Sequence, residues 1–145
     1  MDEPRALAVH PANGLMFWTD WGKLPRIESA FLDGSSRKII VGTSIGWPNG
    51  LAIDFEQNRL YWADAQLDRI EAVDFDGQNR LVVVKQVLHP YGVAVHGPYV
   101  YWTDWQNKAI ERADKHNGLD KQLITDNIEF LMEIRMVTAA RAQGG

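Results

Sequence analysis

Three aspartates recur at a fixed place behind a pair of aromatic residues, and their carboxylates are the groups in the chain best suited to chemistry. A ring of such carboxylates is one way to bind Ca²⁺. A buried carboxylate can instead accept hydrogen bonds from the backbone or side chains of a neighbouring repeat. Because an active site seldom needs three equivalent copies, we favour structural contacts between repeats and predict no metal site. The residues given this role are Asp20, Asp64 and Asp104, with Trp18, Trp62 and Trp102 of the aromatic pairs.

The remaining composition excludes several other functions. The chain has 145 residues, no Cys and a formal net charge of −4, which argues against a nucleic-acid partner. Its four His residues show no metal-ligand spacing, and no nucleophile elbow or phosphate-binding Gly loop is present. No apolar run is long enough to cross a membrane, so we expect no membrane contact by this segment. We therefore predict a protein that is not an enzyme and needs no cofactor. A metal-dependent hydrolase stays as the less favoured alternative, since the non-repeating cluster of Asp, Glu, Asn or His ligands that it needs is missing from these repeats.

The aromatic pairs belong to a longer repeat, which predicts the elements that position these side chains. Trp18, Trp62 and Trp102 lie 44 and 40 residues apart, and each is followed by Ile-Glu and then by Asp-Gly or Asn-Gly. Each unit predicts four short strands: an apolar strand after a Pro, a strand ending at the aromatic-x-Asp, a strand opening with Ile-Glu and ending at the Gly turn, and a fourth apolar strand. Four strands in about 40–45 residues are typical of a β-propeller blade.

The fold class is therefore all-β, with about three four-stranded blades. We place the blade units at about 4–46, 47–88 and 89–128. Residues 130–137 align with the first strand of a further unit, which predicts a closing strand, and residues 138–145 form a tail. Because closed propellers typically use about 4–8 blades, we expect a partial ring. Its two uncovered faces would be apolar, so we expect the isolated chain to self-associate, to misfold or to be marginally stable.

Antiparallel pairing predicts a binding face. Residues that enter the first strand and residues that leave the second must share one end of each blade. At these positions the units differ from each other, whereas the scaffold repeats. Exposed aromatic residues mixed with a few polar groups are typical of a protein-contact surface; the alternative is that some of the rings plug the mouth of the propeller. The predicted ligand-binding residues are Trp47, Asn49, Trp21, Trp105, Tyr91, Phe130, Arg5 and His89.

A second repeated pair joins an arginine to a glutamate two residues later. Arg26 precedes Glu28 and Arg69 precedes Glu71, and residues i and i+2 share a strand face. We interpret these pairs as solvated structure on the outside of the blades.

The units resemble the YWTD, or class B, repeats of the low-density lipoprotein receptor family. Tyr-Trp-Thr-Asp, with Pro-x-Gly-Leu-Ala before it and Ile-Glu and Asp-Gly after it, carries the resemblance over essentially the whole chain. The resemblance implies a six-bladed propeller of which this chain is the C-terminal half. It also implies an extracellular, multidomain, single-pass cell-surface receptor in which an EGF-like module follows the propeller.

Finer similarity points to the Wnt co-receptor branch of the LDL-receptor-related proteins. The stretches "SIGWPNGLAIDF" and "YWTDWQNKAIERADK" are most similar to propellers whose aromatic face binds Wnt and secreted antagonists. By position that face falls on Trp47, Asn49, Trp21 and Trp105. The second unit has Ala65 where the others have Trp, so its part of the surface is expected to be flatter. The endocytic branch, with uptake of cargo proteins or acid-dependent ligand release in which His89 would take part, stays as the alternative.

Overall fold

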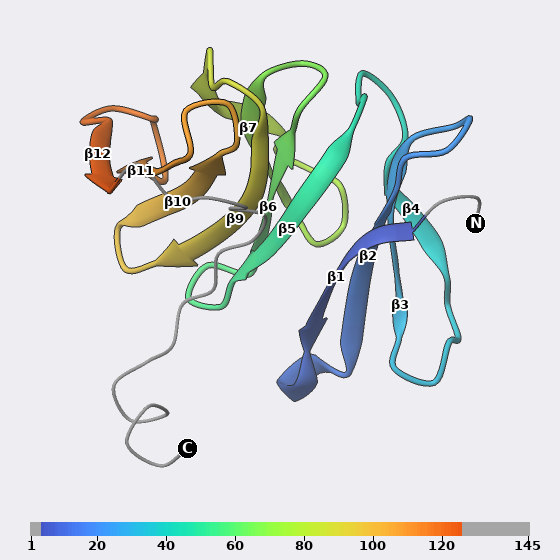
Figure 1. Cartoon of the computed structure of the whole chain (residues 1–145). Helices are drawn as coiled ribbons and strands as arrows, with labels where there is room; N and C mark the ends of the chain where they lie inside the picture. The colour runs from blue at the N-terminus through green and yellow to red at the C-terminus, as the bar shows by residue number, and fades with distance from the viewer. Residues whose placement is uncertain (1–3, 126–145) are drawn as a thin grey trace.

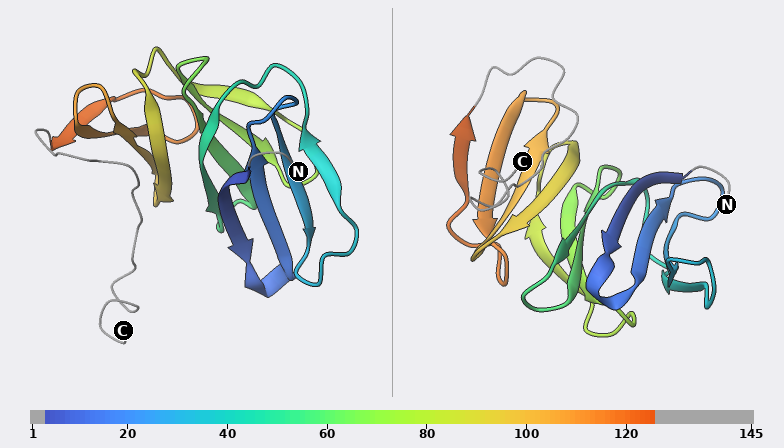
Figure 2. Two further views of the ribbon diagram at one scale, coloured as in Figure 1. Left: turned by 45° about the vertical axis from the view of Figure 1, so that its right-hand side comes forward. Right: turned by 90° about the horizontal axis from the view of Figure 1, so that it is seen from below.

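The computed structural model describes residues 4–125, and these form twelve β-strands in three four-stranded antiparallel sheets. Each sheet is made of four strands that are consecutive in the sequence. The three sheets stand side by side along an arc, like blades around an axis (Figures 1 and 2). The predicted closing strand and the tail lie outside the described residues.

The first blade contains β1 (Pro4–His10), β2 (Leu15–Asp20), β3 (Arg26–Phe31) and β4 (Lys38–Val41). The second contains β5 (Pro48–Asp54), β6 (Arg59–Asp64), β7 (Arg69–Asp74) and β8 (Leu81–Lys85). The third contains β9 (Pro90–His96), β10 (Tyr99–Asp104), β11 (Ala109–Asp114) and β12 (Gln122–Thr125).

The core lies between neighbouring blades, in one cluster between the first and second and another between the second and third. Trp62 of the second blade packs with Phe17, Ile27 and Ile40 of the first, and all of these side chains are buried. Trp102 of the third blade packs in the same way with Tyr61 and other residues of the second. Trp62 and Trp102 therefore pack against the preceding blade, and Phe17 and Tyr61, the first aromatics of their pairs, pack against the following one. Neighbouring residues of a strand point to opposite faces because the strand has a period of two.

The fourth strand of every blade carries a one-residue bulge. Ile27 pairs with Val41 and Glu28 with Ile39, so Ile40 is the extra residue, and Val83 and Ile124 take the same place in the other blades. A bulged residue leaves the ladder of backbone hydrogen bonds. The carbonyls of Ile40 and Val83 face the glycine turns of the next blade: a Cβ on Gly77 would lie 2.8 Å from the Ile40 oxygen, and one on Gly118 only 1.9 Å from the Val83 oxygen. Both glycines also have positive φ, so no other residue fits there without strain.

A second contact between blades joins the end of the first strand to the residue that follows the third strand of the next blade. At the junction of the first two blades His10 meets Phe75, with ring centroids 5.6 Å apart in an edge-on arrangement. At the next junction Asp54 meets Lys115 instead, with Oδ2 and Nζ 2.8 Å apart. The same position therefore carries an aromatic contact at one junction and a buried ion pair at the other.

Two details differ from the sequence-based expectation. The third strands end at Phe31, Asp74 and Asp114, two or three residues before the Asp-Gly or Asn-Gly pairs, which lie in the loop that follows. At Gly77 and Gly118 this loop contacts the preceding blade. The glutamates of the Arg-x-Glu pairs are also not solvated: Glu28 and Glu71 are 3% and 2% exposed. Each is held by its predicted partner and by a second arginine, Arg37 or Arg80, whose guanidinium lies over Trp18 or Trp62. The prediction missed this burial because it weighed only the neighbouring arginine.

Candidate functional site

A hollow of about 260 Å³ opens at the end of the blades where the first strands begin. Residues of all three blades line it, and most are aromatic or able to carry a positive charge. They are Arg5 from the first blade, Trp47, Asn49 and Ala65 from the second, and His89, Tyr91 and Trp105 from the third. The hollow therefore lies where the three blades converge, and its chemistry is not repeated from blade to blade.

Antiparallel pairing brings these residues together. The first residue of each first strand pairs with the aspartate that ends the second strand: Pro4 with Asp20, Pro48 with Asp64 and Pro90 with Asp104. The pairing continues one residue further in two blades. Ala65 N–H donates to the Trp47 carbonyl at 3.0 Å, and Trp105 N–H donates to the His89 carbonyl at 3.2 Å.

A β-bulge at the start of each first strand accounts for the direction of the lining side chains. In β1 the pairing passes from Pro4–Asp20 to Leu7–Trp18, so one residue is extra; β5 and β9 show the same irregularity after Pro48 and Pro90. Bulges commonly re-aim a side chain beside a functional site. Here the bulged stretches contain Arg5, Asn49 and Tyr91, and all three line the hollow. The sequence argument placed these residues before the strands, whereas the structure places them inside.

Arg5 crosses the hollow from the first blade to the third. Its guanidinium carbon lies 5.1 Å from the centroid of the Trp21 ring and 5.0 Å from that of the Tyr91 ring. Its Nη2 also donates to the Tyr91 hydroxyl. Such a cation over two aromatic faces is attracted by both ring quadrupoles. These contacts with Trp21 and Tyr91 fix the position of the Arg5 side chain, which remains exposed to solvent.

The rim of the hollow exposes large apolar side chains. Trp47 is 42% exposed and Trp105 is 53% exposed, although both residues flank fully formed strands. Ala65, which stands where the other two units have Trp21 and Trp105, is 7% exposed and also lines the hollow. Exposed tryptophans beside a concave, partly polar surface are the groups that dominate protein–protein contacts.

The repeated aspartates lie beneath this surface. The Asp64 carboxylate accepts hydrogen bonds from the backbone N–H groups of Gly46, Trp47, Gln66 and Leu67 at 2.8–3.1 Å. It thus ties the connection between the first two blades to the turn after β6, and it orients the backbone of Trp47. Asp104 accepts from the backbone and side chain of Asn107, and Asp20 accepts from Gly22 and lies 3.4 Å from Arg26.

The structure brings together six of the eight predicted ligand-binding residues. Arg5, Trp47, Asn49, His89, Tyr91 and Trp105 all line the hollow, and Trp21 joins them through its contact with Arg5. Phe130 lies outside the described residues. The sequence argument missed a third member of each Arg–Glu cluster, although its spacing was visible: Arg37 and Arg80 each follow the glutamate by nine residues.

A search for a metal site gave no candidate in the described range. Within residues 4–125 no three or more His, Asp or Glu side chains converge as metal ligands would. The described residues also include no helix long and apolar enough to cross a membrane.

Consecutive four-stranded antiparallel blades, each with an aromatic-x-Asp at the end of its second strand, define this chain as part of a β-propeller of YWTD type. The chain belongs to the family of the low-density lipoprotein receptor repeat class B, whose model matches residues 14–55, 58–96 and 99–132.

Curated relatives are receptor proteins or similar to them. The chain is 41% identical over 145 residues to the human "Low-density lipoprotein receptor-related protein 5-like protein", covering 99% of this chain and 57% of that protein. It is 46% identical over 123 residues to the vitellogenin receptor Yl of Drosophila melanogaster and 46% identical over 124 residues to human low-density lipoprotein receptor-related protein 5. Those matches cover 84% and 86% of this chain but only 6% and 8% of the receptors, so the chain spans a small part of these larger proteins.

Solved structures agree on the fold. A chain of a nidogen/laminin complex superposes with a TM-score of 0.81 at 28% identity, covering 92% of this chain and 51% of that one. The calcium-binding protein regucalcin from Agrobacterium tumefaciens superposes with a TM-score of 0.71 over 93% of this chain and 49% of its own, but at 14% identity it shows the fold alone.

Proposed function

We propose that this chain is the ligand-binding part of a non-enzymatic, extracellular receptor propeller, and that its ligand is a protein that docks on the hollow and its tryptophan rim. The observation that carries the proposal is the gathering of six non-repeating residues from three blades around one opening. The main packing residues of the blades recur from unit to unit, as the aromatic-x-Asp does, whereas these residues do not. The lining differs in each blade, which is what recognition of a single asymmetric partner requires.

The side chains indicate how a protein would be held. Trp47 and Trp105 offer exposed ring area, whose burial contributes most of the affinity in typical protein interfaces. The Asn49 amide has both a donor and an acceptor, and so can pair with a ligand backbone or side-chain amide. Arg5, which is already held between two rings, adds a positive charge that favours an acidic group on the ligand.

Among ligand classes we favour a Wnt or a secreted antagonist. The support is the resemblance of the Trp-Pro-Asn-Gly stretch to the Wnt co-receptor branch, together with the 46% identity to human low-density lipoprotein receptor-related protein 5. The alternative is an endocytic cargo protein, and the equal identity to a vitellogenin receptor supports it. In either case the parent protein would be a single-pass cell-surface receptor, with an EGF-like module adjacent to the propeller.

Binding measurements with rim variants test the proposal. The chain would be immobilised and exposed in turn to a purified Wnt, a secreted Wnt antagonist and vitellogenin as the cargo probe. We expect Trp47→Ala and Trp105→Ala to weaken binding of the recognised probe by about tenfold or more, since each removes an exposed ring from the contact. Leu24→Ala is the matched control, because Leu24 is 72% exposed and does not line the hollow.

The outcomes separate the alternatives. Binding of a Wnt or antagonist that depends on both tryptophans supports the favoured class, and equally dependent binding of vitellogenin supports the endocytic class. Binding that Leu24→Ala weakens as much as Trp47→Ala, or no binding of any of the three probes, contradicts the proposal.

A further inference from the structure

Charge is distributed unevenly between the two ends of the described blades. Antiparallel pairing places the start of each first strand, the turn after each second strand and the connections between blades at one end, here called the hollow end because it contains the hollow. The other turns lie at the opposite end, here called the far end. The formal net charge of the whole chain is −4, so an even distribution would make both ends slightly acidic.

The hollow end is positive instead. Its exposed charged side chains within residues 4–125 are all cationic, and they come from all three blades: Arg5, Lys23, Lys85 and Lys108. Among the described turns and connections of this end no carboxylate is fully exposed. Asp68, in the turn after β6, is half-buried, and the repeated aspartates are buried.

Exposed carboxylates gather at the far end. They lie in the turns that join third to fourth strands and in the turn between β5 and β6, and they are Asp33, Glu56, Asp76 and Asp120. Arg37 and Lys121 are also exposed there, but each faces a glutamate of its own blade. The negative charge of the described residues is therefore presented away from the hollow.

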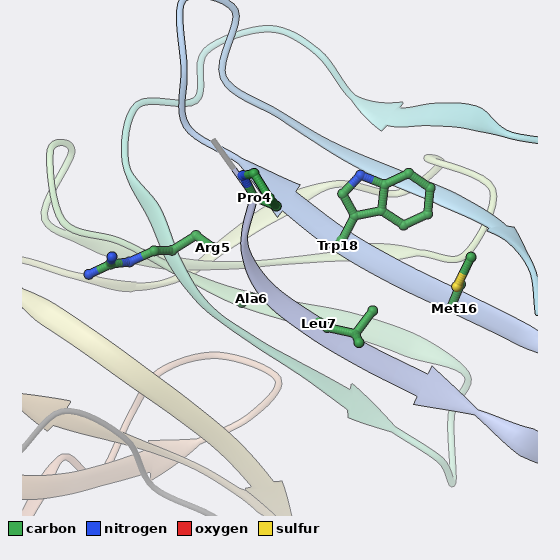
Figure 3. Close-up of a pocket in the computed structure, with 6 residues that line it drawn as sticks. All are labelled: Pro4, Arg5, Ala6, Leu7, Met16 and Trp18. Atoms are coloured by element: carbon green, nitrogen blue, oxygen red, sulfur yellow. The ribbon is translucent and has the colours of Figure 1, made fainter. Parts of the chain in front are cut away.

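Arg5 brings the positive charge of the hollow end into the hollow itself. Figure 3 shows its side chain extending away from the neighbouring side chains of Met16 and Trp18. The guanidinium carbon instead lies 5.1 Å from the ring centroid of Trp21 and 5.0 Å from that of Tyr91. A planar guanidinium that is already oriented loses less conformational entropy when it pairs with a carboxylate, to which it can donate two parallel hydrogen bonds.

We propose that the segment of a protein ligand that docks on the hollow end is acidic, with one carboxylate paired to Arg5 and others facing Lys23, Lys85 and Lys108. This inference rests on the proposed function, because it names the chemistry of the ligand for the same surface. Opposite potentials raise the association rate and orient a ligand before contact. The carboxylates of the far end would repel the same segment, so the two ends together select one docking direction.

A sulfated polysaccharide is another polyanion that a positive surface can bind. Sites for such polymers are typically short runs rich in Lys and Arg. Here the cations stand singly on three blades, and the rings of Trp47 and Trp105 are 42% and 53% exposed beside them. Single charges mixed with exposed aromatic rings favour an acidic protein segment.

Two fluorescein-labelled peptides test the proposal. Both contain the same Gly, Ser and Leu residues, and they differ only in carrying Glu or Gln at the remaining positions. Fluorescence anisotropy with the whole chain would give both dissociation constants over a range of NaCl concentrations. We expect the Glu peptide to bind about tenfold more tightly than the Gln peptide at low salt, and this preference to shrink as salt screens the charges.

Charge-reversal variants locate the binding. Lys85→Glu and Lys108→Glu should each weaken binding of the Glu peptide by about fivefold and leave the Gln peptide unchanged. Lys38→Glu is the matched control, since it changes the net charge equally and Lys38 is an exposed residue that begins β4 at the far end. Thermal melts followed by circular dichroism would establish that the three variants remain folded.

The outcomes are distinct from those of the rim variants. Equal binding of the two peptides, binding of neither, or equal effects of Lys38→Glu and Lys108→Glu would overturn the proposal. Heparin is the third probe: heparin binding that depends on Lys85 and Lys108, without binding of the Glu peptide, would assign the charge to a polysaccharide and overturn the proposal as well. Each of these results leaves intact any whole-protein binding that depends on Trp47 and Trp105, so this inference can fail while the proposed function stands.

Discussion

Lys115 Nζ lies 2.8 Å from Asp54 Oδ2 across the junction of the third and second blades, and both side chains are almost completely buried, at 3% and 2% exposure. The oxygen has no aligned hydrogen bond from a described residue, so attraction between opposite charges carries the contact. Removing one member of such a pair leaves an uncompensated buried charge. This relationship makes the junction sensitive to single substitutions but tolerant of paired ones.

Lys115→Met should lower the free energy of unfolding by roughly 3–5 kcal/mol, because it leaves the Asp54 carboxylate buried without its cation. Urea denaturation followed by tryptophan fluorescence would measure the change. The double variant Asp54→Leu, Lys115→Met removes both charges and should recover most of the loss. A loss of less than about 1 kcal/mol in the single variant would show that the ion pair contributes little to the junction.

Trp62→Ala and Trp47→Ala should separate packing from recognition. Trp62 is fully buried between two blades, so its truncation should destabilise the fold by about 3–5 kcal/mol. Trp47 is 42% exposed, and its truncation should change the free energy of unfolding by only about 0.5 kcal/mol. Thermal melts of the two variants would compare them directly. A large loss with Trp47→Ala would make this residue part of the scaffold.

Gly50→Ala should destabilise the contact between the first strands of the second and third blades. A Cβ at this position would lie 2.4 Å from the Tyr91 carbonyl oxygen and 3.0 Å from the Val93 nitrogen, and both are backbone atoms that cannot move independently. We expect a loss of about 1–3 kcal/mol in chemical denaturation. Gly42→Ala is the matched control, since its Cβ would meet only the Cγ2 methyl of Ile39, at 3.2 Å, and no backbone atom. Equal effects of the two substitutions would contradict this account.

Stability should fall in acid through Glu28. A hydrogen bond from Arg37 holds the pKa of this carboxyl below its usual value of 4.5, although burial opposes the shift, and Arg26 acts in the same direction as Arg37. The unfolded chain therefore binds the proton first, so the contribution of Glu28 is complete above pH 4.5 and is lost as pH falls through the lower, folded pKa.

Glu28→Gln should accordingly reduce the slope of unfolding free energy against pH in the region below about pH 5. Denaturation curves from pH 3 to 7 would give the slope, and Asp120→Asn serves as the control at an exposed carboxylate. An unchanged slope in Glu28→Gln would show that the Arg37 contact does not persist in solution.

The repeated features of this fold could be predicted from the sequence because every blade solves the same packing problem. The aromatic-x-Asp and the Pro before the first strand recur in register, and they predicted the three sheets that are observed. Antiparallel pairing alone then predicted that Trp47 and Trp105 share one end of the blades, and both line the hollow. The repeated residues predict the fold because three copies of one pattern are unlikely to arise by chance.

Contacts that do not repeat could not be predicted in this way. The Asp54–Lys115 pair joins residues that are 61 positions apart, and its counterpart in the first junction is His10 with Phe75. No sequence pattern relates an ion pair to an aromatic pair. Only the structure shows that the two pairs occupy equivalent positions at the two junctions. The bulges that contain Arg5, Asn49 and Tyr91 were missed for a related reason: an extra residue changes the direction of a side chain without changing the sequence motif.

Arg5 has a consequence for mechanics as well as for binding. Its bond to the Tyr91 hydroxyl joins the first blade to the third and bypasses the second, so it acts as a strut across the arc. A ligand carboxylate that draws the guanidinium away from Tyr91 would break this contact between the first and third blades. A ligand that fills the space beneath the guanidinium would instead make the contact more rigid. A ligand in the hollow would therefore act on the contact between the first and third blades through one side chain.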